Sequence, residues 1–110
     1  MQGWLILIAA IVLEVAGTTA MKLSDGFTRP LPSVLLVVFY LFSLAALTLA
    51  LKRIDVGVAY AIWAGVGTVL VAIVGVMWFR EPISLLKVAS ILMIAAGVIG
   101  LHLSNTAGEY

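Results

Sequence analysis

The chain alternates long apolar runs with short polar connections, and this pattern predicts four membrane-spanning helices. Each run is close to the roughly 20 residues that a helix needs to cross a bilayer. Because the connections are short, consecutive helices are expected to be antiparallel neighbours. We therefore predict an all-α membrane protein, a single four-helix transmembrane domain over residues 1–110, with helices at about 4–21, 34–51, 56–79 and 84–103.

Prolines and charged residues mark the connections. Pro30 and Pro32 are expected to keep the first connection out of a helix, and Ser33 is the expected N-cap of the second helix. The second connection is the short charged segment 52–55, and Pro82 suits the first turn of the last helix.

Composition excludes several classes of protein. Hydrophobic residues make up 65% of the chain, charged residues 10%, and the mean hydropathy is +1.28, which indicates an integral membrane protein in contact with the lipid bilayer. A net charge of +1 offers no basic surface for nucleic acid, and the absence of cysteine excludes thiolate metal sites. The lone His102 has no nucleophile or metal-ligand cluster around it in the sequence, so we expect no enzyme, no metal and no cofactor.

One charge, Glu14, lies in the middle of the first apolar run. An ionised carboxylate at that depth costs at least about 2.5–3.5 kcal/mol on insertion scales. The ordinary explanation is an ion pair with a basic residue of another helix, but every Lys and Arg of this chain lies at the ends of the apolar runs or between them. Glu14 must therefore be protonated, hydrated in a cavity, or paired with a cation from outside.

Small residues surround this carboxylate on its own helix. Ala10, Gly17, Thr18 and Met21 share a helical face with Glu14, because they are three or four residues apart along it. That face is expected to leave room beside the carboxylate.

Polar and aromatic residues share faces on the next two helices. Tyr40 and Ser43 do so on the second, and Tyr60 and Trp63 on the third, well inside the apolar run. Core packing is the ordinary explanation for such rings. With an unpaired Glu14 in the same membrane, we favour a box for an organic cation, to which each ring adds about 0.5–2 kcal/mol.

Glycine and serine mark two further features. Gly65 and Gly67 permit close packing of the third helix or a kink in it. Ser90 and Gly97 share a face of the fourth helix, where small residues favour helix association in lipid, either within the chain or with a partner.

The distribution of basic residues fixes orientation only weakly. Four spans place Lys52 and Arg53 on one side and the remaining four basic residues, Lys22, Arg29, Arg80 and Lys87, on the other. Under the positive-inside rule this bias is small, so insertion in both orientations is physically reasonable.

Three stretches, Glu14 to Lys22, Ser24 to Arg29 and Ala59 to Gly67, resemble the motifs of the small multidrug resistance family, and the resemblance extends over essentially the whole chain. It implies an antiparallel, dual-topology homodimer in the bacterial inner membrane. It also implies that this dimer exports organic cations in exchange for protons, which compete with the substrate for Glu14 of both subunits.

The resemblance also implies residue roles. Tyr40, Ser43, Tyr60 and Trp63 would join Glu14 in the substrate site. Gly65 and Gly67 would form the flexible point of the third helix. The dimer contact would fall on the fourth helix, at Ser90, where Gly is common in the family, and Gly97.

Gly17 and Thr18, together with Tyr40, resemble the branch that exports quaternary ammonium and other lipophilic cations. Guanidinium exporters typically carry Trp at the position of Gly17, which we expect to leave the substrate site wide. A guanidinium-type exporter, or one subunit of a heterodimeric polyamine or lipid transporter, remains an alternative within the family.

Three other classes also use or tolerate a membrane carboxylate. An ATP synthase rotor subunit is usually a two-helix hairpin rich in Gly and Ala. A cation channel would conduct without proton coupling, and a small structural subunit would tolerate Glu14→Gln.

Overall fold

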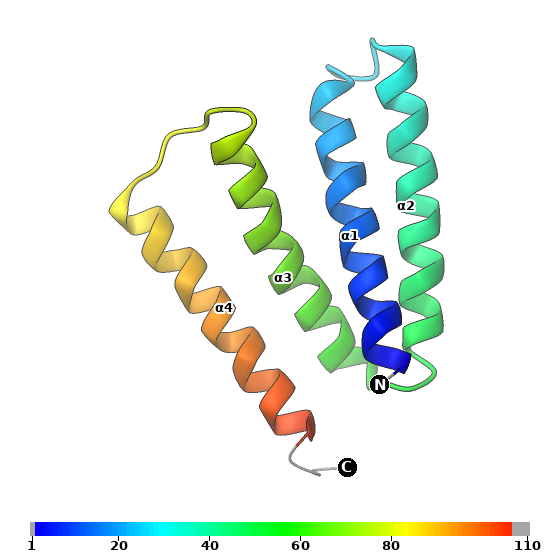
Figure 1. Ribbon diagram of the computed structural model, residues 1–110, viewed down its shortest axis with the longest axis vertical. Coiled ribbons are helices and arrows are strands. Elements are labelled where there is room, and N and C mark those ends of the chain that lie inside the picture. The colour runs from blue at the N-terminus through cyan, green and yellow to red at the C-terminus, as the bar shows by residue number, and fades with distance from the viewer. Residues whose placement is uncertain (1, 107–110) are drawn as a thin grey trace. The chain divides into compact units, whose positions relative to one another are not determined.

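A computed structural model describes residues 2–106 of the chain, with side chains described through Ser104. Within this range it contains four helices and no strand: α1 (Gln2–Leu23), α2 (Pro30–Ala50), α3 (Val56–Met77) and α4 (Leu85–Thr106) (Figure 1). All four are long and apolar enough to cross a membrane. The predicted four-helix, all-α architecture is confirmed.

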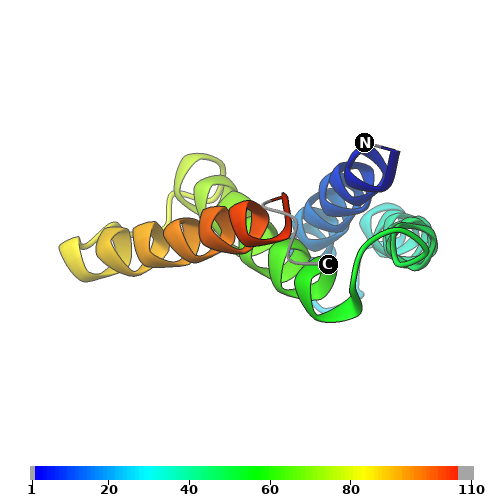
Figure 2. The same cartoon turned by 90° about the horizontal axis from the view of Figure 1, so that it is seen from below.

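The helices pair into two compact units, one formed by residues 1–55 and the other by residues 56–110. In the first unit α1 lies alongside α2, and in the second α3 lies alongside α4, as Figures 1 and 2 show from two directions. The helices of each pair run antiparallel because a short connection joins them.

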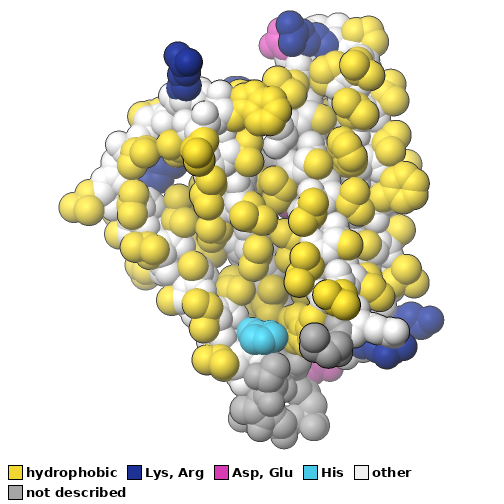
Figure 3. All heavy atoms as spheres, in the orientation of Figure 1, with side chains coloured by type: hydrophobic (Ala, Val, Ile, Leu, Met, Phe, Trp, Pro, Cys, Tyr) yellow, Lys and Arg dark blue, Asp and Glu magenta, His cyan; other side chains and the backbone are white. Residues whose placement is uncertain are grey.

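Apolar side chains dominate the exterior of the helices. On the face in Figure 3, hydrophobic side chains cover most of the helical surface, while the acidic side chains and most of the basic ones lie near the helix ends. Through Ser104, α4 has no buried residue, and Leu85 is 86% exposed. Such a surface would aggregate in water but is compatible with lipid, which is as apolar as leucine.

The connection between α1 and α2 is an ordered turn built on Ser24, which is buried. The backbone N–H groups of Thr28 and Arg29 both donate to the Ser24 carbonyl, at 2.9 and 3.1 Å. Asp25, Gly26 and Phe27 have φ values of 48°, 69° and 68°, and glycine adopts this left-handed conformation at little cost. Three consecutive left-handed residues reverse the chain within this short connection.

This turn changes where α2 begins. The helix starts at Pro30, earlier than the sequence suggested, with the extended Arg29 in the N-cap position. A proline in the first helical turn loses no hydrogen bond, because the N–H groups there have no partner within the helix. The prediction that Ser33 is the N-cap is therefore wrong. Its hydroxyl donates to the Arg29 carbonyl at 2.6 Å, one turn inside the helix.

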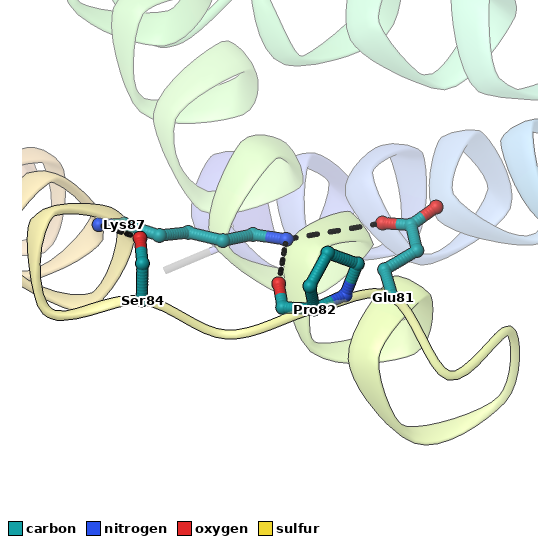
Figure 4. Close-up of polar contacts among 4 residues, drawn as sticks. All are labelled: Glu81, Pro82, Ser84 and Lys87. Carbon is teal, nitrogen blue, oxygen red and sulfur yellow. Dashed lines mark hydrogen bonds and ion pairs between the residues drawn. The ribbon is translucent and has the colours of Figure 1, made fainter.

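A polar cluster connects α3 and α4 (Figure 4). The Glu81 backbone N–H donates to the Gly75 carbonyl at 3.0 Å, and its carboxylate lies where a Gly75 side chain would be. The Lys87 ammonium donates to the Pro82 carbonyl at 3.0 Å and lies 4.0 Å from Glu81 Oε1. Pro82 is outside α4, contrary to the sequence prediction. Ser84 caps that helix, because its hydroxyl accepts from the Lys87 backbone N–H.

Gly65 of α3 packs closely against apolar side chains of α4. A Cβ placed on Gly65 would lie 2.5 Å from Val98 Cγ2 and 3.5 Å from Ile94 Cγ2. The helix is continuous through Gly65 and Gly67. Close packing against α4 therefore accounts for the first glycine in this conformation, whereas the predicted hinge remains a prediction.

We expect Gly65→Ala to destabilise the protein, because its methyl group would overlap Val98. Overpacking typically costs about 1–3 kcal/mol, which exceeds or cancels the roughly 1 kcal/mol that Ala gains over Gly in a helix. Gly57→Ala, in the same helix but with no atom within 4 Å of the new Cβ, should cost nothing. Unfolding in detergent micelles by denaturant titration would measure both, and equal stability of the two variants would contradict this packing role.

Candidate functional site

Glu14 and Thr18 lie one turn apart on α1, so their side chains share a face. The Thr18 hydroxyl donates to Glu14 Oε2 at 2.5 Å, and both residues are half-buried. In the described part of the chain Glu14 forms no ion pair, and its side-chain partner is this hydroxyl. This agrees with the sequence, in which no Lys or Arg lies in the middle of an apolar run.

Tyr40 of α2 extends this contact to a second helix. Its hydroxyl lies 2.6 Å from Thr18 Oγ1, so Glu14, Thr18 and Tyr40 form one hydrogen-bonded chain across the α1–α2 pair. Tyr40 is half-buried. When Glu14 is ionised, the bond that it accepts from Thr18 is charge-assisted and stronger than a neutral one, whereas the bond between Thr18 and Tyr40 joins two neutral hydroxyl groups. The three side chains of the first unit thus form a polar site inside an apolar helix pair.

Gly17 is what allows the Tyr40 ring to lie there. A Cβ on this buried glycine would be 3.0 Å from Tyr40 Cδ1, 3.3 Å from Tyr40 Cε1 and 3.3 Å from Phe39 Cβ. The expectation that Gly17 leaves open space beside the carboxylate differs from this arrangement, because the Tyr40 ring fills that space. The sequence carried a signal for the contact, a small residue one position before Thr18, but it did not show which side chain of α2 would cover it.

Ser43 makes a different contact from the one the sequence suggested. It is fully buried, and its hydroxyl donates to the Ala10 carbonyl on α1 at 2.7 Å. Its hydroxyl hydrogen is therefore used in joining the two helices. The predicted role of Ser43 in binding substrate stays a prediction.

Tyr60 and Trp63 belong to the second unit, where both lie on α3. Their ring centroids are 5.4 Å apart with the planes tilted by 55°, so they share one face of the helix as predicted. Tyr60 is 58% exposed, and the Trp63 indole N–H is buried without a hydrogen-bond partner in the described chain. A buried donor of this kind is uncommon and is available to an acceptor.

The predicted dimer-contact residues lie on the uncovered surface of α4. The Ser90 hydroxyl donates to the Leu86 carbonyl of the same helix at 2.8 Å, and Ser90 and Gly97 are exposed. Nothing lies within 4 Å of a Cβ placed on Gly97 or on Gly100. In the described chain this small-residue face has open space in front of it.

The described residues contain no group of three His, Cys, Asp or Glu side chains that could hold a metal ion. What the site in the first unit can do is bind a proton or an organic cation on a carboxylate held by hydroxyl groups.

The amino-acid sequence is similar to those of a known protein family. The model of the family described as Small Multidrug Resistance protein matches residues 2–94. The chain is 56% identical over 102 residues to the uncharacterized membrane protein YvaE of Bacillus subtilis (strain 168), covering 93% of this chain and 86% of the relative. It is 46% identical over 109 residues to multidrug resistance protein EbrB of the same organism, covering 99% and 93%. It is 42% identical over 104 residues to the guanidinium exporter of Escherichia coli (strain K12), covering 94% and 99%.

The hydrogen bond from Ser43 to the Ala10 carbonyl should contribute to the stability of the α1–α2 pair. Ser43→Ala should destabilise the protein by about 0.5–1.5 kcal/mol, because it removes a buried hydrogen bond between helices. Thr48→Ala is the matched control, since the exposed Thr48 hydroxyl bonds to Leu44 of its own helix. Denaturant unfolding in micelles would compare them. A Ser43→Ala protein as stable as the control would show that the bond to Ala10 contributes nothing.

Proposed function

Because the chain belongs to the small multidrug resistance family, we propose that it exports lipophilic and quaternary ammonium cations in exchange for protons, with both competing for Glu14. It is a multi-pass protein of the bacterial plasma membrane and a transporter rather than an enzyme.

The observation that carries this proposal is a half-buried carboxylate on a membrane-spanning helix without an ion pair. A carboxylate withdrawn from water is stabilised by a proton or by a cation, and the two cannot both bind it tightly at the same time. A cation arriving at Glu14 therefore displaces the proton, and a proton displaces the cation. Exchange across the membrane follows when the site opens to each side in turn.

Aromatic rings favour lipophilic organic cations as the substrate. The Tyr40 ring lies against Gly17, and its hydroxyl contacts Thr18, the hydrogen-bond partner of Glu14. On α3, Tyr60 and Trp63 supply a tilted ring pair that we assign to cation–π contact with the substrate. A bulky cation carrying aryl or alkyl groups gains from such rings and needs few hydrogen bonds. The name of multidrug resistance protein EbrB is consistent with this class.

Guanidinium is the second candidate substrate. Among the relatives, a guanidinium exporter is 42% identical to this chain over nearly its whole length. A guanidinium ion is a planar donor of several hydrogen bonds and would use the Glu14 carboxylate and hydroxyl oxygens near it. It benefits less from apolar rings, which is why we place it second.

We further propose that two copies assemble as an antiparallel homodimer. The support is the small-residue face of α4, where Ser90, Gly97 and Gly100 are exposed, because such faces let helices approach closely in lipid. The weak bias of basic residues is compatible with insertion in both orientations. A second copy would supply a second Glu14.

Equilibrium binding of tetraphenylphosphonium to the purified protein tests the function. We expect binding to strengthen as the pH rises through one range, because protons leave Glu14, and we expect guanidinium to compete poorly. Glu14→Gln should abolish the pH-dependent binding. Asp25→Asn is the matched control, because Asp25 is exposed in the first connection and asparagine tolerates its positive φ.

Three results would contradict the proposal in different ways. Proton-coupled uptake retained by Glu14→Gln would remove Glu14 from the mechanism. Displacement or transport of guanidinium, without binding of the bulky cation, would move the protein to the second candidate. Binding of neither cation by the pure protein, together with binding after a second, different subunit is added, would exclude the homodimer.

A further inference from the structure

Hydrogen bonds join Glu14 to Tyr40 through the Thr18 hydroxyl. Tyr40 does not hydrogen-bond to Glu14 directly in the described chain. It reaches the carboxylate through the Thr18 hydroxyl, at 2.6 Å from Tyr40 to Thr18 and 2.5 Å from Thr18 to Glu14. Any effect of the Tyr40 hydroxyl on the carboxylate through hydrogen bonds therefore passes through Thr18.

The number of hydrogens fixes the direction of this chain when Glu14 is charged. A carboxylate only accepts, and a threonine hydroxyl has one hydrogen to donate. The Thr18 hydrogen goes to Glu14 Oε2, so the hydrogen between Thr18 and Tyr40 must come from the tyrosine. In this state the lone pairs of the Tyr40 oxygen point away from the chain.

Addition of a proton to Glu14 allows the direction to reverse. A protonated Glu14 can donate to Thr18, which then donates to Tyr40, which then turns its own hydrogen outward. Only one proton is added, at Glu14, and the two hydroxyl groups rotate without breaking an O–H bond. The Tyr40 hydroxyl would thus present its negative end when Glu14 is charged and its positive end when Glu14 is protonated.

We propose that Thr18 couples Tyr40 to the charge of Glu14, so that Tyr40 acts as a positioning residue that favours a cation only while Glu14 is ionised. The inference rests on the proposed function, because it assigns a further task to the same site. A reversing hydroxyl would sharpen the competition between proton and substrate. It would make the site less attractive to a cation once a proton has bound.

Few other titratable groups of the first unit lie near these three side chains and could respond to the charge of Glu14. On α2 Tyr40 is the only residue with a titratable side chain, and on α1 the other one is Lys22, in the last turn. Lys22 is two turns of helix from Glu14. In the described part of the first unit, the hydroxyl chain joins the Glu14 side chain to α2 by hydrogen bonds, and we assign the transmission of the Glu14 charge to it.

Gly17 provides an independent way to disturb the same contact. The Tyr40 ring is 3.0 Å from a Cβ built on Gly17, a tight distance, so a methyl group there requires the ring to shift by a few tenths of an ångström. Gly17→Ala keeps all three polar side chains but changes the position of the phenol relative to Thr18. It should therefore weaken the contact that Thr18→Val removes.

The test is an NMR titration of the purified protein without substrate, in micelles, with ¹³C-labelled tyrosine and glutamate. We expect the Tyr40 Cζ shift to follow the Glu14 carboxyl shift as the pH changes, and Tyr40→Phe assigns the tyrosine signal. In Thr18→Val the Glu14 signal should still titrate, while the Tyr40 signal no longer follows it, and in Gly17→Ala the Tyr40 signal should follow it more weakly. Thr18→Ser, which restores the hydroxyl, should restore the coupling.

Thr19→Val is the matched control, because the Thr19 hydroxyl bonds to the Val15 carbonyl of its own helix at 2.9 Å. It should titrate as the wild type does. A Tyr40 signal that follows Glu14 equally well in Thr18→Val would overturn the proposal, as would a Tyr40 signal that never follows Glu14 in the wild type. Since no substrate is present, this result does not depend on which cation is exported.

A double-mutant cycle on tetraphenylphosphonium binding at high pH gives a second readout. Each single change, Thr18→Val or Tyr40→Phe, should weaken binding about three- to tenfold, the range expected for loss of one hydrogen bond. The double variant should bind no more weakly than Thr18→Val alone, because the tyrosine acts through the threonine. Losses that multiply would show independent roles and contradict the coupling. Failure of the wild type to bind the cation would count against the proposed function, while the NMR titration still decides the coupling.

Discussion

A carboxylate inside an apolar helix, without a basic residue at the same depth, is the constraint on which the rest of this protein depends. The membrane makes that charge expensive, and the chain provides no cation to compensate for it. The response within the first unit is a set of hydroxyl contacts, Thr18 on Glu14 and Tyr40 on Thr18. These contacts satisfy the carboxylate partly and leave it open to a proton or a cation, which is what a carrier of either requires.

Small residues make this arrangement possible because in lipid the helices gain little from apolar burial and depend on close packing. Gly17 lets the Tyr40 ring approach, and the close approach at Ala10 lets the Ser43 hydroxyl reach a backbone carbonyl of α1. In the second unit Gly65 accommodates Val98 of α4. Glycines that look alike in sequence thus serve different contacts, one with the aromatic ring of Tyr40 in the candidate site and one with an aliphatic side chain of the neighbouring helix.

Local rules predicted the number and approximate extent of the helices but misplaced two prolines relative to them. Pro30 was expected to lie before a helix and instead opens one, because the left-handed turn at residues 25–27 delivers the chain to it in an extended conformation. Pro82 was expected inside a helix and lies outside one, in a segment held by Glu81 on Gly75 and by Lys87. Both errors come from contacts that span several residues, which single-residue preferences do not include.

The sequence alone determined that the chain crosses a membrane with four helices, that Glu14 has no cation of its own, and which family the chain resembles. These conclusions depend on hydropathy, on the positions of charges along the chain and on motifs, all of which are readable in one dimension. Only the tertiary structure decided that Tyr40 reaches Glu14 through Thr18, that Ser43 bonds to Ala10, and that Gly65 lies under Val98. Helices that are apolar all round carry no polar stripe to fix their rotation against one another, so these pairings depend on side-chain shape in three dimensions.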